Sequence, residues 1–423
     1  MSSIEFVFTK EIEVYFFFSY KFLDERGNLI PLSELKKFRD EIAKTRPKLF
    51  EDIKFDNKKA YYSFFDSFCT DENMPLVVSI SPNKVNIGKD SENLNGEITE
   101  DSVSPMSIQI RLSQYGIATI RVFFKLTPDK TKIFDNNFLA LLLKDLKHQG
   151  KEYANTAWRI FCGIWNKISQ YQISKHESEH IDIYMVLFSR GIEVRYNDKK
   201  IMLADLKRGN KNISKNIIED NIKKMLVGLA ISSYLWPRYS KDFVKKFIMS
   251  DISTTENEFQ FIAWRNALIY FEGEKTELPV TYRNYLYDML LGLELLFLIR
   301  SSLQLLDVTV DKEIGQRLIR SKINLLKLIK FKSYHHALEY LDRWLLAITG
   351  WRQIDRYAVI THFHDFLKVA LQAMRIDIWL NTVSNKISLL RDIVKVQSDK
   401  IATMNLIFLT LILVVLTIFL IFK

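Results

Sequence analysis

The fold is decided by a stretch near the C-terminus, NLIFLTLILVVLTIFLIF, residues 405–422. The sequence between Lys400 and Lys423 contains no charged residue. At about 1.5 Å per helical residue, about 20 residues cross a hydrocarbon core about 30 Å thick. An unpaired backbone amide costs several kcal/mol in lipid, so such a run crosses as a helix. We therefore predict a transmembrane tail over residues 401–423.

The alternative for this run is a buried core helix. Leu, Ile, Val and Phe occur on every face of the run, and no later residues follow to cover it. Basic residues precede it at Lys386, Arg391, Lys395 and Lys400, whereas only Lys423 follows. The positive-inside bias then places the N-terminal part in the cytosol.

The N-terminus gives no sign of a secretory signal. Its first apolar residues have no basic region before them and are interrupted by Glu5, Glu11 and Glu13. We therefore expect a single-pass, tail-anchored membrane protein with a cytoplasmic N-terminal domain.

The charge and cysteine content of the chain limit the kinds of partner that we expect it to bind. The chain has 60 Lys plus Arg against 50 Asp plus Glu, a net charge of +10. This excess is spread along the sequence, which favours attraction to anionic lipid headgroups over a nucleic-acid groove. Two cysteines, Cys69 and Cys162, provide neither a disulfide framework nor a metal-binding spacing, as expected in a reducing cytosol.

A regular apolar pattern precedes the tail. Its steps alternate between four and three residues, the 3.5-residue repeat of a left-handed coiled coil. Because neither Pro nor Gly occurs from Trp351 to Lys423, we predict one helix from about Arg356 to Phe422, with residues 356–400 as a stalk. The seam of this stalk consists of Val369, Ala373, Ile376, Leu380, Val383, Ile387, Leu390, Val394 and the polar Gln397.

Two partners are possible for this seam. It packs against earlier helices of the same chain, or it packs against other copies of the protein. We expect self-association, because a single helix below a globular domain has little else to cover its seam. Gln397 would then fix the register of the coiled coil.

The first 275 residues predict a mixed α/β domain. Strands are expected near residues 4–8, 12–18 and 76–80, and helices from residue 33 and over 137–169. Residues 89–105 are acidic, polar and rich in turn formers, which favours a mobile loop.

Alternating apolar residues predict two hairpins in this domain. One joins Ile108–Leu112 to Ile120–Phe124, and the other joins Ile181–Phe188 to Ile192–Tyr196. One further strand is expected within residues 258–274.

Helices are expected after residue 275. The segment 282–306 is strongly apolar, but Glu294 and Arg300 divide it into runs too short to cross a membrane. We predict a core helix there, within a helical domain of residues 276–355. The predicted fold class is therefore α+β: a mixed N-terminal α/β domain, a helical region, and a long stalk helix that continues into a single transmembrane helix.

This arrangement resembles the CorA family of divalent-cation channels. The approach to the membrane, QSDKIATMNLIFLTLI at residues 397–412, is similar in character to the stalk-to-pore junction of that family. The resemblance implies a homopentamer whose stalk helices line a pore and whose cytosolic domain senses magnesium. The sequence contains neither the Gly-Met-Asn signature nor the second span of that family.

A pore requires polar lining residues. Thr403, Thr410 and Thr417 are seven residues apart and share one helix face, so they are the pore-lining candidates, with Asn405 as another polar residue of the span. The alternative is that each threonine hydroxyl binds the carbonyl of residue i−4, which makes threonine acceptable in lipid.

One motif matches the pattern of a catalytic zinc site. His176, Glu177 and His180 match the H-E-x-x-H pattern, in which two histidines bind zinc and the glutamate acts as a general base. Glu179, the strand-like sequence that follows, and the lack of a third ligand favour a charged loop instead. Residues 89–105 also hold clustered carboxylates, but without EF-hand spacing. We therefore predict no catalytic residue, no resident metal and no cofactor, while a divalent cation remains possible.

These observations favour a non-enzymatic, homo-oligomeric membrane protein. Its cytosolic domain would bind a signal or a partner, and the coiled-coil stalk would connect that domain to the lipid bilayer. The alternatives are a CorA-like cation channel or membrane-permeabilising effector, which implies ion transport, and a membrane-tethered zinc peptidase.

Overall fold

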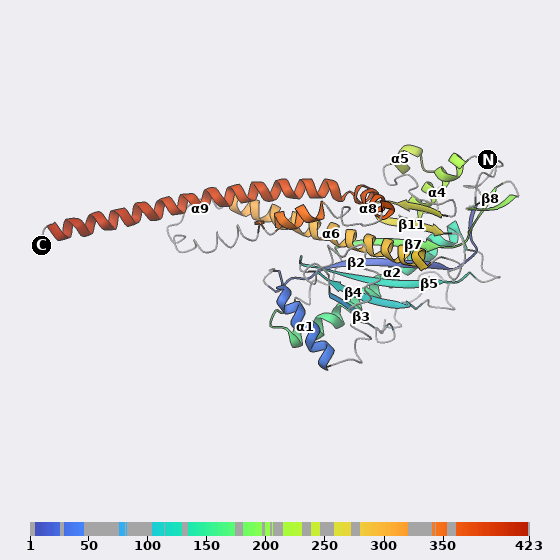
Figure 1. The fold of residues 1–423 in the computed structure, drawn as a ribbon, viewed down its shortest axis with the longest axis horizontal. Helices are drawn as coiled ribbons and strands as arrows, with labels where there is room; N and C mark the ends of the chain where they lie inside the picture. Colours follow the sequence, from blue (N-terminus) through green and yellow to red (C-terminus); the bar gives the residue numbers. More distant parts are fainter. Residues whose placement is uncertain are drawn as a thin grey trace. The chain divides into compact units, whose positions relative to one another are not determined.

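The structure is a computed structural model of the 423-residue chain. It forms two compact units, Met1–Ser302 with Asp355–Ile376, and Leu303–Ile354 with Asp377–Lys423. The predicted mixed α+β class with long C-terminal helices is confirmed (Figure 1). The structure describes residues 5–25, 29–45, 76–80, 82, 104–113, 115–128, 134–173, 181–196, 199–203, 205, 215–230, 238–245, 258–271, 280–319, 341–342, 344–352 and 361–421.

The first unit is built on a seven-stranded sheet. Its strand order is β10-β11-β7-β2-β5-β4-β3, and every neighbouring pair is antiparallel except β11 and β7. The predicted hairpin around Gly116 is confirmed as β4 and β5, and Gly116 has a φ of 77° that suits glycine. The strands are β2 (Ile12–Lys21), β3 (Leu76–Ile80), β4 (Ser107–Leu112), β5 (Ile117–Leu126), β7 (Asp182–Ser189), β10 (Glu258–Ile262) and β11 (Asn266–Phe271).

A smaller sheet has the order β6-β1-β8-β9. The predicted hairpin over residues 181–196 is wrong, because β7 and β8 pair in different sheets. Instead, β1 pairs with β8 in the smaller sheet and β2 pairs with β7 in the larger one, both antiparallel. Phe8 lies opposite Ile192, and Ile12 lies opposite Ser189. The strands of this sheet are β1 (Glu5–Phe8), β6 (Phe134–Asp135), β8 (Ile192–Tyr196) and β9 (Lys199–Met202).

Gly191 lies where the chain passes from β7 in the larger sheet to β8 in the smaller one. The amide of Thr9 donates a hydrogen bond to the Gly191 carbonyl at 2.9 Å. A Cβ atom on residue 191 would lie 2.6 Å from the Thr9 hydroxyl oxygen. Only glycine therefore permits the two backbones to approach this closely.

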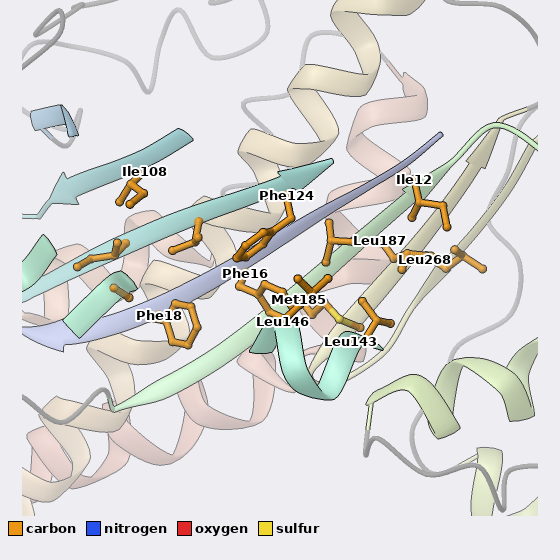
Figure 2. Packing of buried hydrophobic residues seen from close by; sticks show 14 of the residues in the cluster. Ile12, Phe16, Phe18, Ile108, Phe124, Leu143, Leu146, Met185, Leu187 and Leu268 are labelled. Carbon is orange, nitrogen blue, oxygen red and sulfur yellow. The ribbon is translucent and has the colours of Figure 1, made fainter. Parts of the chain in front are cut away.

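Alternation along β2 divides its side chains between two faces of the sheet. Phe16 and Phe18 belong to the main hydrophobic cluster, together with Leu143 and Leu146 of helix α2 (Asn136–Ile168) (Figure 2). Phe17 lies on the opposite face, with its ring centroid 6.1 Å from that of Phe297 in helix α6 (Val280–Ile319). The sheet is therefore covered by helices on both faces.

The predicted core helix within residues 282–306 is confirmed as part of α6. In its most apolar window, within Met289–Lys312, 83% of the residues are buried. Helix α8 (Thr361–Ala373) lies close to α6, because a Cβ atom on residue 292 would be 3.1 Å from the side chains of Phe363 and Leu367. In the structure, α6 as far as Ser302 and all of α8 belong to the sheet unit. The domain boundaries at 275, 355 and 400 stay a prediction.

The predicted single helix from about Arg356 to Phe422 is wrong. It is interrupted at Met374 and Arg375, between α8 and helix α9 (Ile376–Ile421). Arg375 has a φ of 57°, and its amide donates to the carbonyl of Gln372 at 3.0 Å. A left-handed residue after the last turn is a common way to end a helix.

The remaining differences are local. The single strand predicted within residues 258–274 is two strands, β10 and β11, which turn at Trp264 and Arg265. Most of the predicted loop over residues 89–105 lies outside the described residues. The other helices are α1 (Leu32–Thr45), α4 (Lys215–Ala230) and α5 (Lys241–Lys245).

Candidate functional site

The C-terminal part of α9 is apolar and uncovered (Figure 1). Large side chains are exposed from Leu406, at 68%, through Phe408, at 55%, to Val414, at 52%. The most apolar window within Ile376–Val414 has a mean hydropathy of 1.3 and contains no buried residue. By length and composition, this helix is able to cross a membrane.

The pore-lining candidates Thr403, Thr410 and Thr417 are all exposed on α9. Their hydroxyls donate to the carbonyls four residues earlier, those of Asp399, Leu406 and Leu413, at 2.9, 2.8 and 2.7 Å. Each hydroxyl proton therefore has a partner within the same helix. This is the geometry that lets threonine face lipid without an unpaired donor.

The seam ahead of the apolar end is a buried stripe. Val369 and Gln397 are half-buried, whereas the remaining predicted members are buried. In the second unit this buried part runs from Leu380, at 3%, to Val394, at 1%. The predicted face of the helix is thus the buried face.

The seam is covered by helices of its own chain. Buried apolar residues of the second unit lie on α6, on α9 and on the helical segment at residues 341–352, which we call the return segment. Leu306 and Val310 belong to α6, and Trp344 and Ile348 to the return segment. The expectation that the stalk has little besides other copies to cover its seam is therefore wrong.

Polar contacts fix α9 against these two neighbours. The Lys386 ammonium donates to carboxylates of Asp307 and Asp311 in α6 at 2.7 and 2.8 Å. These hydrogen bonds, Asp307 first, raise the pKa of Lys386 above its ordinary value. Arg391 lies 3.1 Å from the carboxylate of Asp342 in the return segment.

A separate group of buried charges fixes α6 to the sheet in the first unit. Glu294 is fully buried. Its carboxylate accepts from Arg111 Nε at 2.6 Å and from Arg121 Nη1 at 3.2 Å, and Arg121 also donates to Gln109. A carboxylate in an apolar helix is acceptable here because two guanidinium groups satisfy it.

Arg300 is the second buried charge of α6. Its Nε and Nη2 atoms lie 2.9 and 2.7 Å from Asp182 Oδ2, and it donates to the carbonyl of Trp264. Burial lowers the pKa of Arg300, and the charge of Asp182 opposes that shift. Its guanidinium also lies 5.5 Å from the centre of the Tyr184 ring.

The described residues contain no group of three or more His, Cys, Asp or Glu side chains placed to hold a metal ion. His176, Glu177 and His180 lie outside the described residues, so the zinc motif stays a prediction. His364 lies 3.4 Å from the carboxylate of its neighbour Asp365 and faces partly outward.

No protein-family model, curated protein or solved structure matches this chain. The resemblance to CorA channels therefore stays a prediction, as do the oligomeric state and the orientation in the membrane.

The sequence reasoning missed the partners of the buried charges. In the sequence, Glu294 and Arg300 stand out only as interruptions of an apolar run. Because a buried charge requires a partner, these two residues were a signal that α6 packs against a polar strip of the sheet. The partners Asp182, Arg111 and Arg121 are distant in sequence, and no local pattern identifies them.

Proposed function

We propose that this protein is a membrane-anchored binding protein. Helix α9 would cross the bilayer from about Ile401 and hold the sheet unit at the cytosolic surface. The observation that carries the proposal is the exposure of every described residue from Leu406 to Val414 on one long helix. An apolar surface of this kind costs free energy in water at about 25 cal/mol per Å², and lipid removes that cost.

The orientation is proposed from charge. Exposed Lys395 and Lys400 precede the apolar stretch, and cytosolic flanks carry an excess of basic residues. The large first unit, with its two sheets, would then lie in the cytosol and bind a signal or a partner. The hydroxyl protons of Thr403, Thr410 and Thr417 are bonded within the helix, which suits contact with lipid.

Alkaline carbonate extraction of membranes tests the anchor. We expect the wild-type chain to stay in the membrane pellet. The double variant Leu409→Arg/Leu413→Arg should move largely to the supernatant, because each arginine at the centre of a span costs about 2.5–3.5 kcal/mol. Leu346→Arg is the matched control, since Leu346 is 78% exposed in the return segment.

Recovery of the wild-type chain in the supernatant would rule out the anchor. The orientation needs a separate test, in which a glycosylation acceptor is appended after Lys423 and the chain is translated with microsomes. We expect the acceptor to be glycosylated, because it would enter the lumen. An unmodified acceptor on a carbonate-resistant chain would show that the protein has the opposite orientation, while the membrane anchor would stand.

A further inference from the structure

A second heptad pattern lies on the flank of α9 beside the buried seam, about 100° round the helix from it. From Leu389 to Val414, steps of four and three residues alternate without a break. The positions are Leu389, Ile393, Val396, Lys400, Thr403, Ile407, Thr410 and Val414. Leu389, Val396, Ile407 and Val414 are 53%, 52%, 59% and 52% exposed. We call this set of positions the outer stripe. It passes from the stalk into the apolar end of the helix.

The residue types of the outer stripe suit a parallel pair of helices. Three of its four a positions are β-branched, namely Ile393, Ile407 and Val414, and the fourth is Lys400. β-Branched residues at a positions favour two-stranded parallel coiled coils, and a single polar residue at such a position sets the register. The d positions are Leu389 and Val396 in the stalk and the polar Thr403 and Thr410 in the apolar end of the helix.

A hollow on the surface of α9 coincides with this pattern. Val396, Asp399, Lys400, Thr403 and Met404 line it. In a parallel coiled coil, each a side chain enters a hole made by four residues of the facing helix. Val396, Asp399, Lys400 and Thr403 occupy the d, g, a and d positions of such a hole.

The charges at this hollow complement one another across a parallel pair. Asp399 is the g residue next to the a residue Lys400, and both side chains are exposed. When two copies align in register, Lys400 of one copy enters the hollow beside Asp399 of the other. An antiparallel arrangement would not bring these two residues together.

We propose that a second copy of this chain packs in parallel against the outer stripe, from Leu389 into the membrane. The proposal rests on the proposed membrane anchor, since helices that cross one bilayer in the same direction are parallel. It differs from the predicted self-association through the seam, because the seam is covered by its own chain.

Disulfide crosslinking in the full-length protein tests the contact. The background carries Cys69→Ser and Cys162→Ala, and the protein is reconstituted in neutral phosphatidylcholine vesicles. Val396→Cys and Thr403→Cys should each form a dimer linked between identical positions, at a rate at least about tenfold above Ala402→Cys. Ala402 is the control, because it is exposed and adjacent to Thr403 but lies off the stripe.

Equal crosslinking at all three positions, or none, would overturn the proposal. A carbonate-resistant protein that behaves as a monomer in vesicles would also overturn it, while the anchor would stand. Loss of the chain from the membrane pellet would instead defeat the proposed function itself. The two failures are therefore distinguishable.

A charge exchange tests the register. Lys400→Glu places like charges beside Asp399 and should weaken the dimer about tenfold, equivalent to about 1.4 kcal/mol. The double variant Asp399→Lys/Lys400→Asp restores opposite charges and should recover most of the dimer. A dimer unaffected by Lys400→Glu, or not recovered by the exchange, would contradict the proposed register.

Discussion

Helices α6 and α9 both pass the length and composition test for a membrane span, yet they have opposite surroundings. In the most apolar window of α6, within Met289–Lys312, 83% of the residues are buried, whereas the apolar window of α9 has no buried residue. The charges explain the difference. Glu294 and Arg300 of α6 have partners on the sheet, whereas the apolar end of α9 has no charge to pair. Hydropathy therefore finds apolar helices, and the pairing of their charges indicates which are core helices.

Removing the Arg300 charge from α6 should have the largest effect on stability. Arg300→Leu removes the guanidinium that neutralises the buried Asp182 carboxylate, so we expect the free energy of unfolding to fall by about 3–5 kcal/mol. Urea unfolding of the detergent-solubilised chain, followed by tryptophan fluorescence, measures the change. Lys312→Leu is the control, because Lys312 is an exposed charge of the same helix.

Adding Asp182→Leu to Arg300→Leu should recover part of the lost stability, because the buried negative charge that Arg300 neutralised is removed as well. Wild-type stability in Arg300→Leu alone would show that the pair does not hold α6 on the sheet.

Glu294→Leu should have a smaller effect, of about 2 kcal/mol. Arg111 and Arg121 lose their shared carboxylate, but their side chains are 11% and 16% exposed and are able to reach water. The same urea titration provides the value. A loss larger than that of Arg300→Leu would reverse the order we expect from burial.

The contact that holds α9 against α6 should be weaker still. Lys386→Gln removes the hydrogen bonds to Asp307 and Asp311, and because the lysine side chain is 29% exposed we expect a loss below about 1 kcal/mol. The raised pKa of Lys386 adds a dependence on pH. The contribution is complete below the ordinary lysine pKa of 10.5 and is lost as the pH rises through the raised folded-state value.

Stability curves of wild type and Lys386→Gln should therefore be separated at pH 7 and should converge above pH 10.5. Curves that separate further at high pH would contradict the assigned direction of the shift.

Local patterns predicted the elements well where their partners are adjacent in sequence. The β4–β5 hairpin follows from alternation on each side of Gly116, and α2 follows from a long helical pattern. The proposed β7–β8 hairpin failed because Ile192 pairs with Phe8, a residue far away in the sequence. The prediction of one continuous helix failed for a different reason. No Gly or Pro marks the break, because the residue in the left-handed conformation is Arg375.

The candidate site shows the same limit. The apolar tail and the seam are visible in the sequence, because both depend on helical spacing. The cover of the seam is not visible, because Leu306, Val310 and Trp344 belong to segments well before it. The outer stripe is also visible in the sequence. The burial of the seam leaves it as an exposed heptad stripe of α9.

The accessibility of Leu409 tests the central claim most directly. A cysteine at this position, in a background that lacks Cys69 and Cys162, is treated with a membrane-impermeant maleimide in sealed vesicles, with Leu346→Cys as the exposed reference. We expect that Leu346→Cys reacts readily and that Leu409→Cys reacts only after detergent is added, because lipid surrounds it. Equal and rapid labelling of both cysteines in intact vesicles would contradict the claim that α9 crosses the membrane.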